Sequence, residues 1–149
     1  MVITRTLGLD IESRPECVEL LSRALCGVCQ LVLSAAEIAK LNLAIVEAVN
    51  NAIEHAYHGE SGHWVRLEID LAPDRLDLRV RDRGQPMPPD RLDAVTAFVP
   101  PDPDDLNTWS LRGRGLAIIK ACMDTVEYEA RDGVNTLAMS RVLTTGKSA

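Results

Sequence analysis

The sequence is poor in aromatic residues and has no hydrophobic run long enough to cross a membrane. Aromatic residues make up 3% of its 149 residues, so aliphatic side chains must supply the core. A membrane helix needs roughly 20 consecutive apolar residues, and no such run occurs. The N-terminus also lacks the basic and then apolar pattern of a signal peptide. We therefore expect a cytoplasmic protein that does not enter a membrane.

An excess of positive charge is also lacking. The formal net charge is −6, and broad nucleic-acid binding needs a basic face that contacts phosphates. Direct nucleic-acid binding is therefore not expected, and proteins are the expected macromolecular partners. A single nucleotide could still bind, because Mg²⁺ and backbone N–H groups can meet its charge. The length and an apolar fraction of 46% fit one domain, residues 1–149.

Cysteine occurs at four positions, but without a clear metal or redox pattern. Cys17 and Cys122 fall in apolar helical patterns and are interpreted as small core residues. Cys26 and Cys29 form a C-x-x-C pair, which leaves a redox or metal role open. No second Cys or His pair with metal-ligand spacing accompanies them, and they do not follow a strand. A structural role is the favoured interpretation.

The apolar pattern predicts strands and helices in the order βααββ-loop-αββ. Alternating or β-branched runs predict strands at 2–11, 63–71, 75–81, 125–130 and 135–142. Helical periodicity predicts helices at about 14–27, 35–57 and 115–123, and capping boxes begin at Ser13 and Ser34. This order predicts an α+β fold, a two-layer sandwich in which helices cover one face of a mostly antiparallel sheet.

Residues 86–112 form a long segment without helical or strand periodicity. Six of the eight prolines lie between Pro86 and Pro103. Long loops inside compact domains are usually functional lids or disordered segments. We interpret this segment as a lid, with a short helical turn at about 90–95.

The predicted helix at 35–57 has two chemically different faces. Apolar side chains recur at helical spacing on one face, at Leu41, Ile45, Val49, Ala52, Ile53 and Ala56. Glu47 and Asn51 lie one turn apart near the opposite side, with Glu54 beside them. A solvated polar face explains this arrangement as well as a functional site does. The pair therefore gains weight only from neighbouring motifs.

Glu47 and Asn51 have the chemistry that phosphoryl transfer requires. Mg²⁺ on nucleotide phosphates takes oxygen ligands and keeps several waters, so the amide oxygen of Asn51 suits it. The carboxylate of Glu47 could orient and deprotonate an attacking hydroxyl near the γ-phosphate. The i, i+4 spacing holds both groups on one side of a rigid helix.

Two later motifs add groups suited to a nucleotide. Asp82 ends a predicted strand, where its carboxylate could accept a hydrogen bond from the amino group of adenine, and Gly84 would let the backbone approach the base. Gly113 and Gly115 lead into a helix whose N-terminal N–H groups could bind an anion. Each motif alone is most often a plain turn. Their order behind the Glu47 helix indicates a nucleotide site.

Together these motifs resemble the N-box and glycine boxes of the GHKL ATPase superfamily, which includes the ATP domains of gyrase and histidine kinases. The matching segments are 47–55, 82–86 and 113–116, and the similarity extends over nearly the whole chain. The chain length and the Glu-Ala-x-x-Asn-Ala-x-x-His form of the first segment are most similar to the bacterial anti-sigma-factor serine/threonine kinases. The fold implied is the GHKL ATP-binding fold, with 86–112 as the ATP lid.

The resemblance implies roles for individual residues. Asn51 matches the Mg²⁺ ligand, Glu47 the general base and Asp82 the carboxylate that contacts adenine. Thr136 matches a threonine near the adenine. Arg112 and Arg114 could add positive charge beside the phosphates. With them, the expected ATP-binding set is Asn51, Asp82, Gly84, Arg112, Gly113, Arg114, Gly115, Leu116 and Thr136.

The resemblance also implies protein partners. Kinases of this family bind a sigma factor and phosphorylate a serine on a STAS-domain anti-anti-sigma protein, and they commonly form homodimers. Two alternatives remain open: a nucleotide-dependent regulator without phosphotransfer, and a detached ATP domain of a histidine kinase. Glu47 favours the kinase, since a pure binder needs no base. Two features depart from the family pattern. Asn50 stands at a position where small hydroxyl residues are frequent in the family, and the lid contains no glycine. The lid departure bears on phosphotransfer more than on nucleotide binding.

Overall fold

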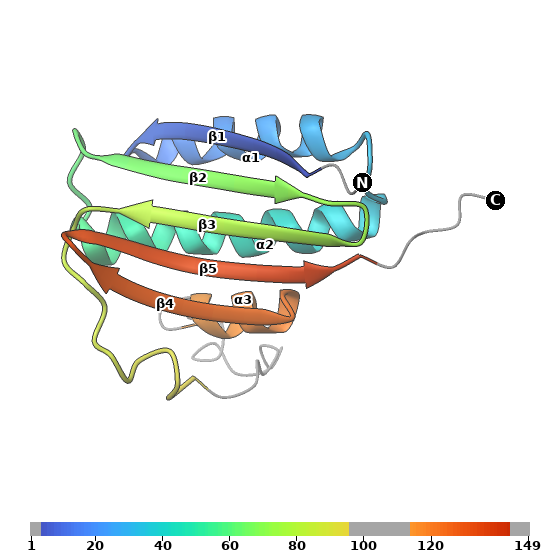
Figure 1. Ribbon diagram of the computed structural model, residues 1–149. Coiled ribbons are helices and arrows are strands. Elements are labelled where there is room, and N and C mark those ends of the chain that lie inside the picture. The colour runs from blue at the N-terminus through green and yellow to red at the C-terminus, as the bar shows by residue number, and fades with distance from the viewer. Residues whose placement is uncertain (1–3, 96–113, 144–149) are drawn as a thin grey trace, which may run out of the picture.

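The computed structural model describes residues 4–95 and 114–143. Within these ranges five strands and three α-helices form two layers, with the helices on one face of the sheet (Figure 1). This confirms the predicted α+β sandwich. In chain order the elements are β1 (Arg5–Glu12), α1 (Pro15–Cys29), α2 (Ala35–Asn51), the π-helical turn η1 (Ala52–Ala56), β2 (Trp64–Leu71), β3 (Arg75–Asp82), α3 (Gly115–Cys122), β4 (Thr125–Arg131) and β5 (Val134–Val142).

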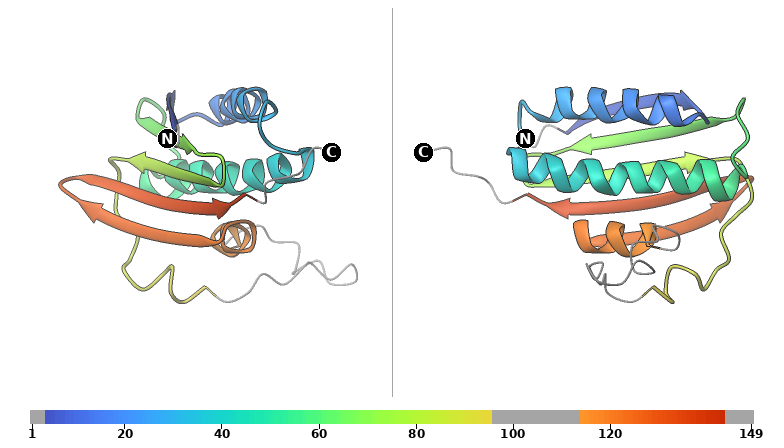
Figure 2. Two further views of the ribbon diagram at one scale, coloured as in Figure 1. Left: turned by 45° about the vertical axis from the view of Figure 1, so that its right-hand side comes forward. Right: turned by 180° about the vertical axis from the view of Figure 1, so that it is seen from behind.

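The sheet has the strand order β1-β2-β3-β5-β4, and all of its pairings are antiparallel. Its centre joins β3 to β5, two strands that belong to different hairpins and are separated along the chain by residues 83–133, which include α3 and β4. In this pairing Asp82 lies directly opposite Asn135. Seen from behind, α1, α2 and α3 lie side by side over the sheet (Figure 2). The C-terminal end of β3 therefore lies beside the β4–β5 hairpin and faces the helical layer.

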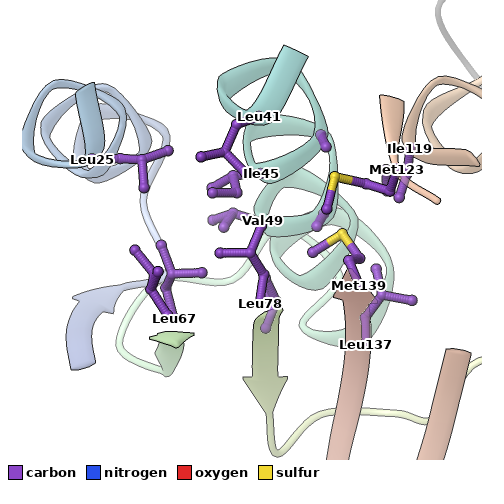
Figure 3. Close-up of a cluster of buried hydrophobic side chains, with 14 of the residues drawn as sticks. Leu25, Leu41, Ile45, Val49, Leu67, Leu78, Ile119, Met123, Leu137 and Met139 are labelled. Atoms are coloured by element: carbon purple, nitrogen blue, oxygen red, sulfur yellow. The ribbon is translucent and has the colours of Figure 1, made fainter. Parts of the chain in front are cut away.

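Aliphatic side chains fill the space between the two layers (Figure 3). Every member of the apolar stripe predicted on α2 and η1 is buried. Burial of each leucine, isoleucine or valine of this stripe contributes about 1.5–3 kcal/mol, which stabilises the packing of α2 on the sheet. No helix within the described residues is long and apolar enough to span a membrane.

The two predicted capping boxes have different outcomes. Ser34 caps α2, since its hydroxyl accepts a hydrogen bond from the Glu37 N–H at 3.2 Å. The box at Ser13 is wrong, because Arg14 stands at the N-cap of α1 and no side chain caps that helix. Ser13 is buried and its hydroxyl bonds instead to the segment before β2, donating to the Glu60 carbonyl at 2.7 Å and accepting from the His63 N–H at 3.1 Å.

The last turn of the second helix is wider than an α-helical turn. The N–H of Tyr57 bonds to the carbonyl of Ala52 at 3.0 Å, and the N–H of Gly59 bonds to that of Ile53 at 2.8 Å. The chain then leaves the helix through His58 and Gly59, both at positive φ. Single π-helical turns occur frequently at functional sites. This turn directly follows Asn51.

Arg141 on β5 connects three elements. Its guanidinium donates to both carboxylate oxygens of Glu37 at the start of α2 and to the Cys122 carbonyl at the end of α3. The Arg141 side chain is 14% exposed and that of Glu37 22%. Hydrogen bonds from Arg141 lower the pKa of Glu37 below its ordinary value.

We expect Arg141→Met to lower the free energy of unfolding by about 3 kcal/mol at pH 7, because it leaves Glu37 charged and partly buried without a partner. The stability that the pair contributes is present above the ordinary pKa of Glu37 and is lost as the pH falls through its lowered folded-state pKa. Urea unfolding at pH 7 and at pH 3 measures both effects. Arg23→Met, which breaks the exposed pair with Glu19, should cost less than about 1 kcal/mol. Equal losses in the two variants would contradict this role of Arg141.

Candidate functional site

Glu47 and Asn51 lie on the same side of α2, and the first residue of α3 packs against both. A Cβ atom added to Gly115 would lie 3.0 Å from Glu47 Oε2 and 3.2 Å from both Asn51 Oδ1 and Asn51 Nδ2. Glycine at this position therefore lets the N-terminus of α3 come close to the two polar side chains. The structure brings together three predicted site residues that are far apart in the sequence.

The environment of Glu47 suits a proton acceptor. Burial raises the pKa of its carboxyl group, and the negative charge of the exposed Glu54 raises it further. A carboxylate with a raised pKa binds a proton more strongly, which brings it closer to the range in which general bases work at neutral pH. His55, in the next turn, is exposed. Both the position of Glu47 and its raised pKa therefore suit a proton acceptor.

Asp82 lies at the end of β3, and neighbouring groups fix one of its oxygens. Burial raises the pKa of its carboxyl group, while hydrogen bonds from Asn135 and from the Gly84 N–H act in the opposite direction. Asn135 Nδ2 donates to Asp82 Oδ1 at 2.7 Å and to the Gly84 carbonyl at 3.0 Å. The Gly84 N–H donates to the same Asp82 Oδ1 at 3.0 Å. The carboxylate is thus held in one orientation.

The backbone that follows Asp82 is attached to its surroundings through its N–H groups. The bonds are Arg83 N–H to the Tyr57 hydroxyl at 2.8 Å, Gln85 N–H to the Ala56 carbonyl at 2.9 Å, and Met87 N–H to the Tyr128 hydroxyl at 2.8 Å. Each partner comes from a different place: the residue after η1, η1 itself and β4. These bonds attach residues 82–87, which we call the strap, to the end of the helical layer and to β4.

Gly84 is required for a reason that the sequence did not reveal. A Cβ atom at this position would lie 2.3 Å from the carbonyl oxygen and 2.6 Å from the carbonyl carbon of Ala56. We predicted that glycine here serves the approach of a base. The close contact in the structure is with the backbone of η1, so glycine is already needed for the strap to reach the end of the helix.

The remaining predicted residues have varied placements. Arg112 and Gly113 lie outside the described residues. Arg114 is the N-cap of α3. Leu116 is 7% exposed and belongs to the hydrophobic core, so its backbone is the part that can face a ligand. Thr136 lies opposite Arg81, on the sheet face away from the helices, because successive strand residues point to opposite faces. Residue 135 rather than 136 contacts Asp82.

The sequence did not point to Asn135, Tyr57 or Tyr128 as site residues. One signal was available for Asn135. It lies on the same face of β5 as the apolar Leu137 and Met139, and it is buried like them. The alternating pattern of this strand calls for an apolar side chain at position 135. An amide found there must have a hydrogen-bond partner, because buried polar groups are almost always hydrogen-bonded.

Of the C-x-x-C pair, Cys29 is buried in the core and Cys26 is half-buried. Cys26 and Cys29 are free thiols on α1. Burial, together with the nearby Cys26, raises the pKa of the Cys29 thiol, which disfavours the reactive thiolate. Within residues 4–95 and 114–143 no three His, Cys, Asp or Glu side chains converge as a metal-binding group.

The sequence matches known proteins over most of its length. Residues 11–141 match the histidine kinase-like ATPase domain. Serine-protein kinase RsbW of Bacillus velezensis is 29% identical over 138 residues, which cover 92% of this chain and 85% of that protein. Serine-protein kinase RsbW of Bacillus subtilis is 29% identical over 138 residues with the same coverage.

The fold also matches a solved structure. In the crystal structure of the RsbU and RsbW domains of a Mycobacterium tuberculosis protein, the matching chain has a TM-score of 0.62 at 20% sequence identity. The match covers 93% of this chain and 32% of that longer chain. At this identity the likeness concerns the fold. Because the domain match spans residues 11–141 and the two layers have the expected arrangement, this chain belongs to the histidine kinase-like ATPase domain family.

Proposed function

We propose that this protein is an ATP-dependent serine/threonine kinase and anti-sigma factor. It binds a sigma factor and phosphorylates a STAS-domain anti-anti-sigma protein in a partner-switching circuit. The observation that carries the proposal is the meeting of Glu47, Asn51 and the N-terminus of α3 at Gly115. The relatives named serine-protein kinase RsbW support it over most of both chains. Its place of action is the cytoplasm, and a homodimer is the expected assembly.

Each residue of the site has a part in nucleotide binding. Asp82 accepts a hydrogen bond from the adenine amino group. The N–H groups at Gly115 and Leu116 face the phosphates, and Arg112, Gly113 and Arg114 continue this phosphate side, with 86–112 as the lid. Asn51 Oδ1 would be an oxygen ligand of a bound Mg²⁺. The amide fits this cation, which when bound neutralises phosphate charge.

Glu47 performs the proton transfer of the proposed reaction. The serine hydroxyl of the antagonist attacks the γ-phosphorus, and its proton passes to the Glu47 carboxylate. The new bond joins the serine oxygen to the γ-phosphorus, while the bond to the β,γ-bridging oxygen breaks and ADP leaves. The raised pKa of Glu47 favours proton acceptance.

The test uses purified protein, radiolabelled ATP with Mg²⁺, and each STAS-domain protein encoded by the source genome. Transfer of label to a serine of one of them is the expected result, together with co-purification of a sigma factor. Tight ATP binding without transfer to any of these proteins would favour the nucleotide-dependent regulator without phosphotransfer. Failure to bind ATP would contradict the proposal altogether.

We expect Asp82→Asn to weaken ADP binding by about 10- to 100-fold, because a hydrogen bond to a charged group contributes about 1.5–3 kcal/mol. The new amide can also present a donor toward the amino group of the base. Calorimetry with Mg-ADP measures the change. Asp77→Asn is the matched control, since Asp77 lies on the other face of β3 beside Arg75. An affinity equal to that of the unchanged protein would contradict the role of Asp82.

A further inference from the structure

α3 is a short helix of eight residues at the edge of the helical layer, beside α2 (Figure 2). Its first residue, Gly115, packs against Glu47 and Asn51, so the position of its N-terminus sets the geometry of the proposed phosphate side. A helix this short is held mainly by tertiary packing. The contacts on the side of α3 that faces away from α2 therefore bear on the site.

Residues 88–95, which we call the docked segment, lie on that side of α3. They form the first part of the predicted lid and run past β4 (Figure 1, yellow). Within them the Ala94 N–H donates to the Asp90 carbonyl at 2.9 Å, as in a helical turn. Leu92 is 8% exposed and belongs to the hydrophobic core, and Val95 packs against that core. This part of the lid is therefore folded onto the domain.

Lys120, in the last turn of α3, attaches the docked segment to the helix. Its ammonium group donates to the Leu92 carbonyl at 2.6 Å and lies 3.5 Å from the Val95 carbonyl oxygen. Both carbonyls stand at the end of the helical turn, where such groups have few partners within the turn. Lysine side chains often bond to carbonyls at helix ends, and a charged donor makes a stronger bond than a neutral one. Lys120 thus caps the turn and joins it to α3.

The contact connects the two sides of the proposed nucleotide site. Asp82 begins the strap, the docked segment directly follows the strap, and Lys120 joins the docked segment to α3. At its other end α3 places Gly115 against Glu47. Phosphoryl transfer depends mainly on positioning, and a misplacement of about 1 Å can cost about 100-fold in rate. Release of α3 from the docked segment should therefore affect the reaction.

We propose that Lys120 is a positioning residue for phosphate transfer. By holding the docked segment against α3, it fixes Gly115 opposite Glu47 and Asn51. It acts through the position of the helix, since it lies in the last turn and Gly115 in the first. This inference rests on the proposed function.

The test variant is Lys120→Met, which removes the charge and keeps a long side chain. In the nucleotide-free variant, backbone amides of the docked segment should exchange hydrogen at least about 10-fold faster than in the unchanged protein. The single-turnover rate of transfer with saturating Mg-ATP should fall by about 10- to 100-fold. ADP affinity should change by less than about 3-fold, because Asp82 and Asn51 lie on β3 and α2.

Controls separate the charged contact from a general loss of structure. Lys120→Arg keeps a charged donor and should retain slow exchange and transfer, and so should Lys40→Met, which changes an exposed lysine on α2. If Lys120→Met does not fold, Ala94→Pro removes the N–H that bonds to Asp90 and should give the same losses.

Unchanged exchange or unchanged transfer in Lys120→Met would overturn the proposal, and so would equal loss of transfer and ADP affinity. If the unchanged protein transfers no phosphate, the proposed function itself fails, while the exchange rates still decide whether Lys120 holds the docked segment.

Discussion

Replacing Glu47 by glutamine is expected to lower the rate of phosphate transfer at least about 100-fold while leaving ADP affinity nearly unchanged. A positioned general base contributes about 10²- to 10⁴-fold, and an amide cannot accept the serine proton. Glutamine has the same shape as glutamate, so it preserves the packing of Gly115 against residue 47. The loss should therefore appear in the chemical step, measured as a single-turnover rate with saturating ATP.

Glu54→Gln is the matched control for Glu47→Gln. Glu54 is exposed, and its charge helps to raise the pKa of Glu47. Removing that charge should lower the pKa of Glu47, so Glu47 stays ionised to a lower pH. The acid limb of the rate–pH profile should then move to lower pH, with transfer otherwise retained. Equal loss of transfer and ADP affinity in Glu47→Gln would reject Glu47 as the base.

The stability of the Glu47→Gln variant supplies a second readout. A raised folded-state pKa means that Glu47 favours the folded state most below its ordinary pKa, and that this contribution is lost as the pH rises through the folded-state pKa. At neutral pH the ionised carboxylate is partly buried and costs stability. Glu47→Gln should therefore have a higher Tm than the unchanged protein at pH 7. A lower Tm would mean that any loss of transfer includes loss of structure.

Local patterns predicted the fold well because apolar spacing determines which face of each element is buried. The stripe on α2 and the alternation in both hairpins depend only on neighbouring residues, and so does the cap at Ser34. The failure at Ser13 has a different origin. Its hydroxyl bonds to Glu60 and His63, partners about 50 residues away, and no local pattern encodes such a contact.

The candidate site was predictable where residue type carries the chemistry. Glu47, Asn51 and Asp82 are groups that a nucleotide site needs, so their spacing and order suggested them. Asn135 depends instead on the register between β3 and β5, and a shift of one residue would place Thr136 on that face. The reason for Gly84 likewise depends on how closely η1 approaches the strap. Such tertiary distances are not visible in the sequence.

That close approach makes Gly84→Ala the most disruptive single-methyl change expected here. The added Cβ would lie 2.3 Å from the Ala56 carbonyl oxygen, which also accepts the Gln85 N–H at 2.9 Å. Both contacts are with backbone, so the methyl group cannot be accommodated by a rotamer change. The strap must move away from η1, and Asp82 would move with it because the Gly84 N–H bonds to its carboxylate.

We expect Gly84→Ala to lower the free energy of unfolding by about 2–3 kcal/mol, as overpacking against a fixed neighbour does, and to weaken ADP binding by at least about 10-fold. Gly27→Ala is the matched control. A Cβ at Gly27 meets nothing within 4 Å, and alanine stabilises a helix interior by about 0.5–1 kcal/mol. Urea unfolding should show that Gly84→Ala is less stable than the unchanged protein and that Gly27→Ala is more stable. Calorimetry should show full ADP affinity for Gly27→Ala only. Wild-type stability and affinity in Gly84→Ala would show that the strap is free to move, which would also remove the basis for fixing Asp82 through Asn135.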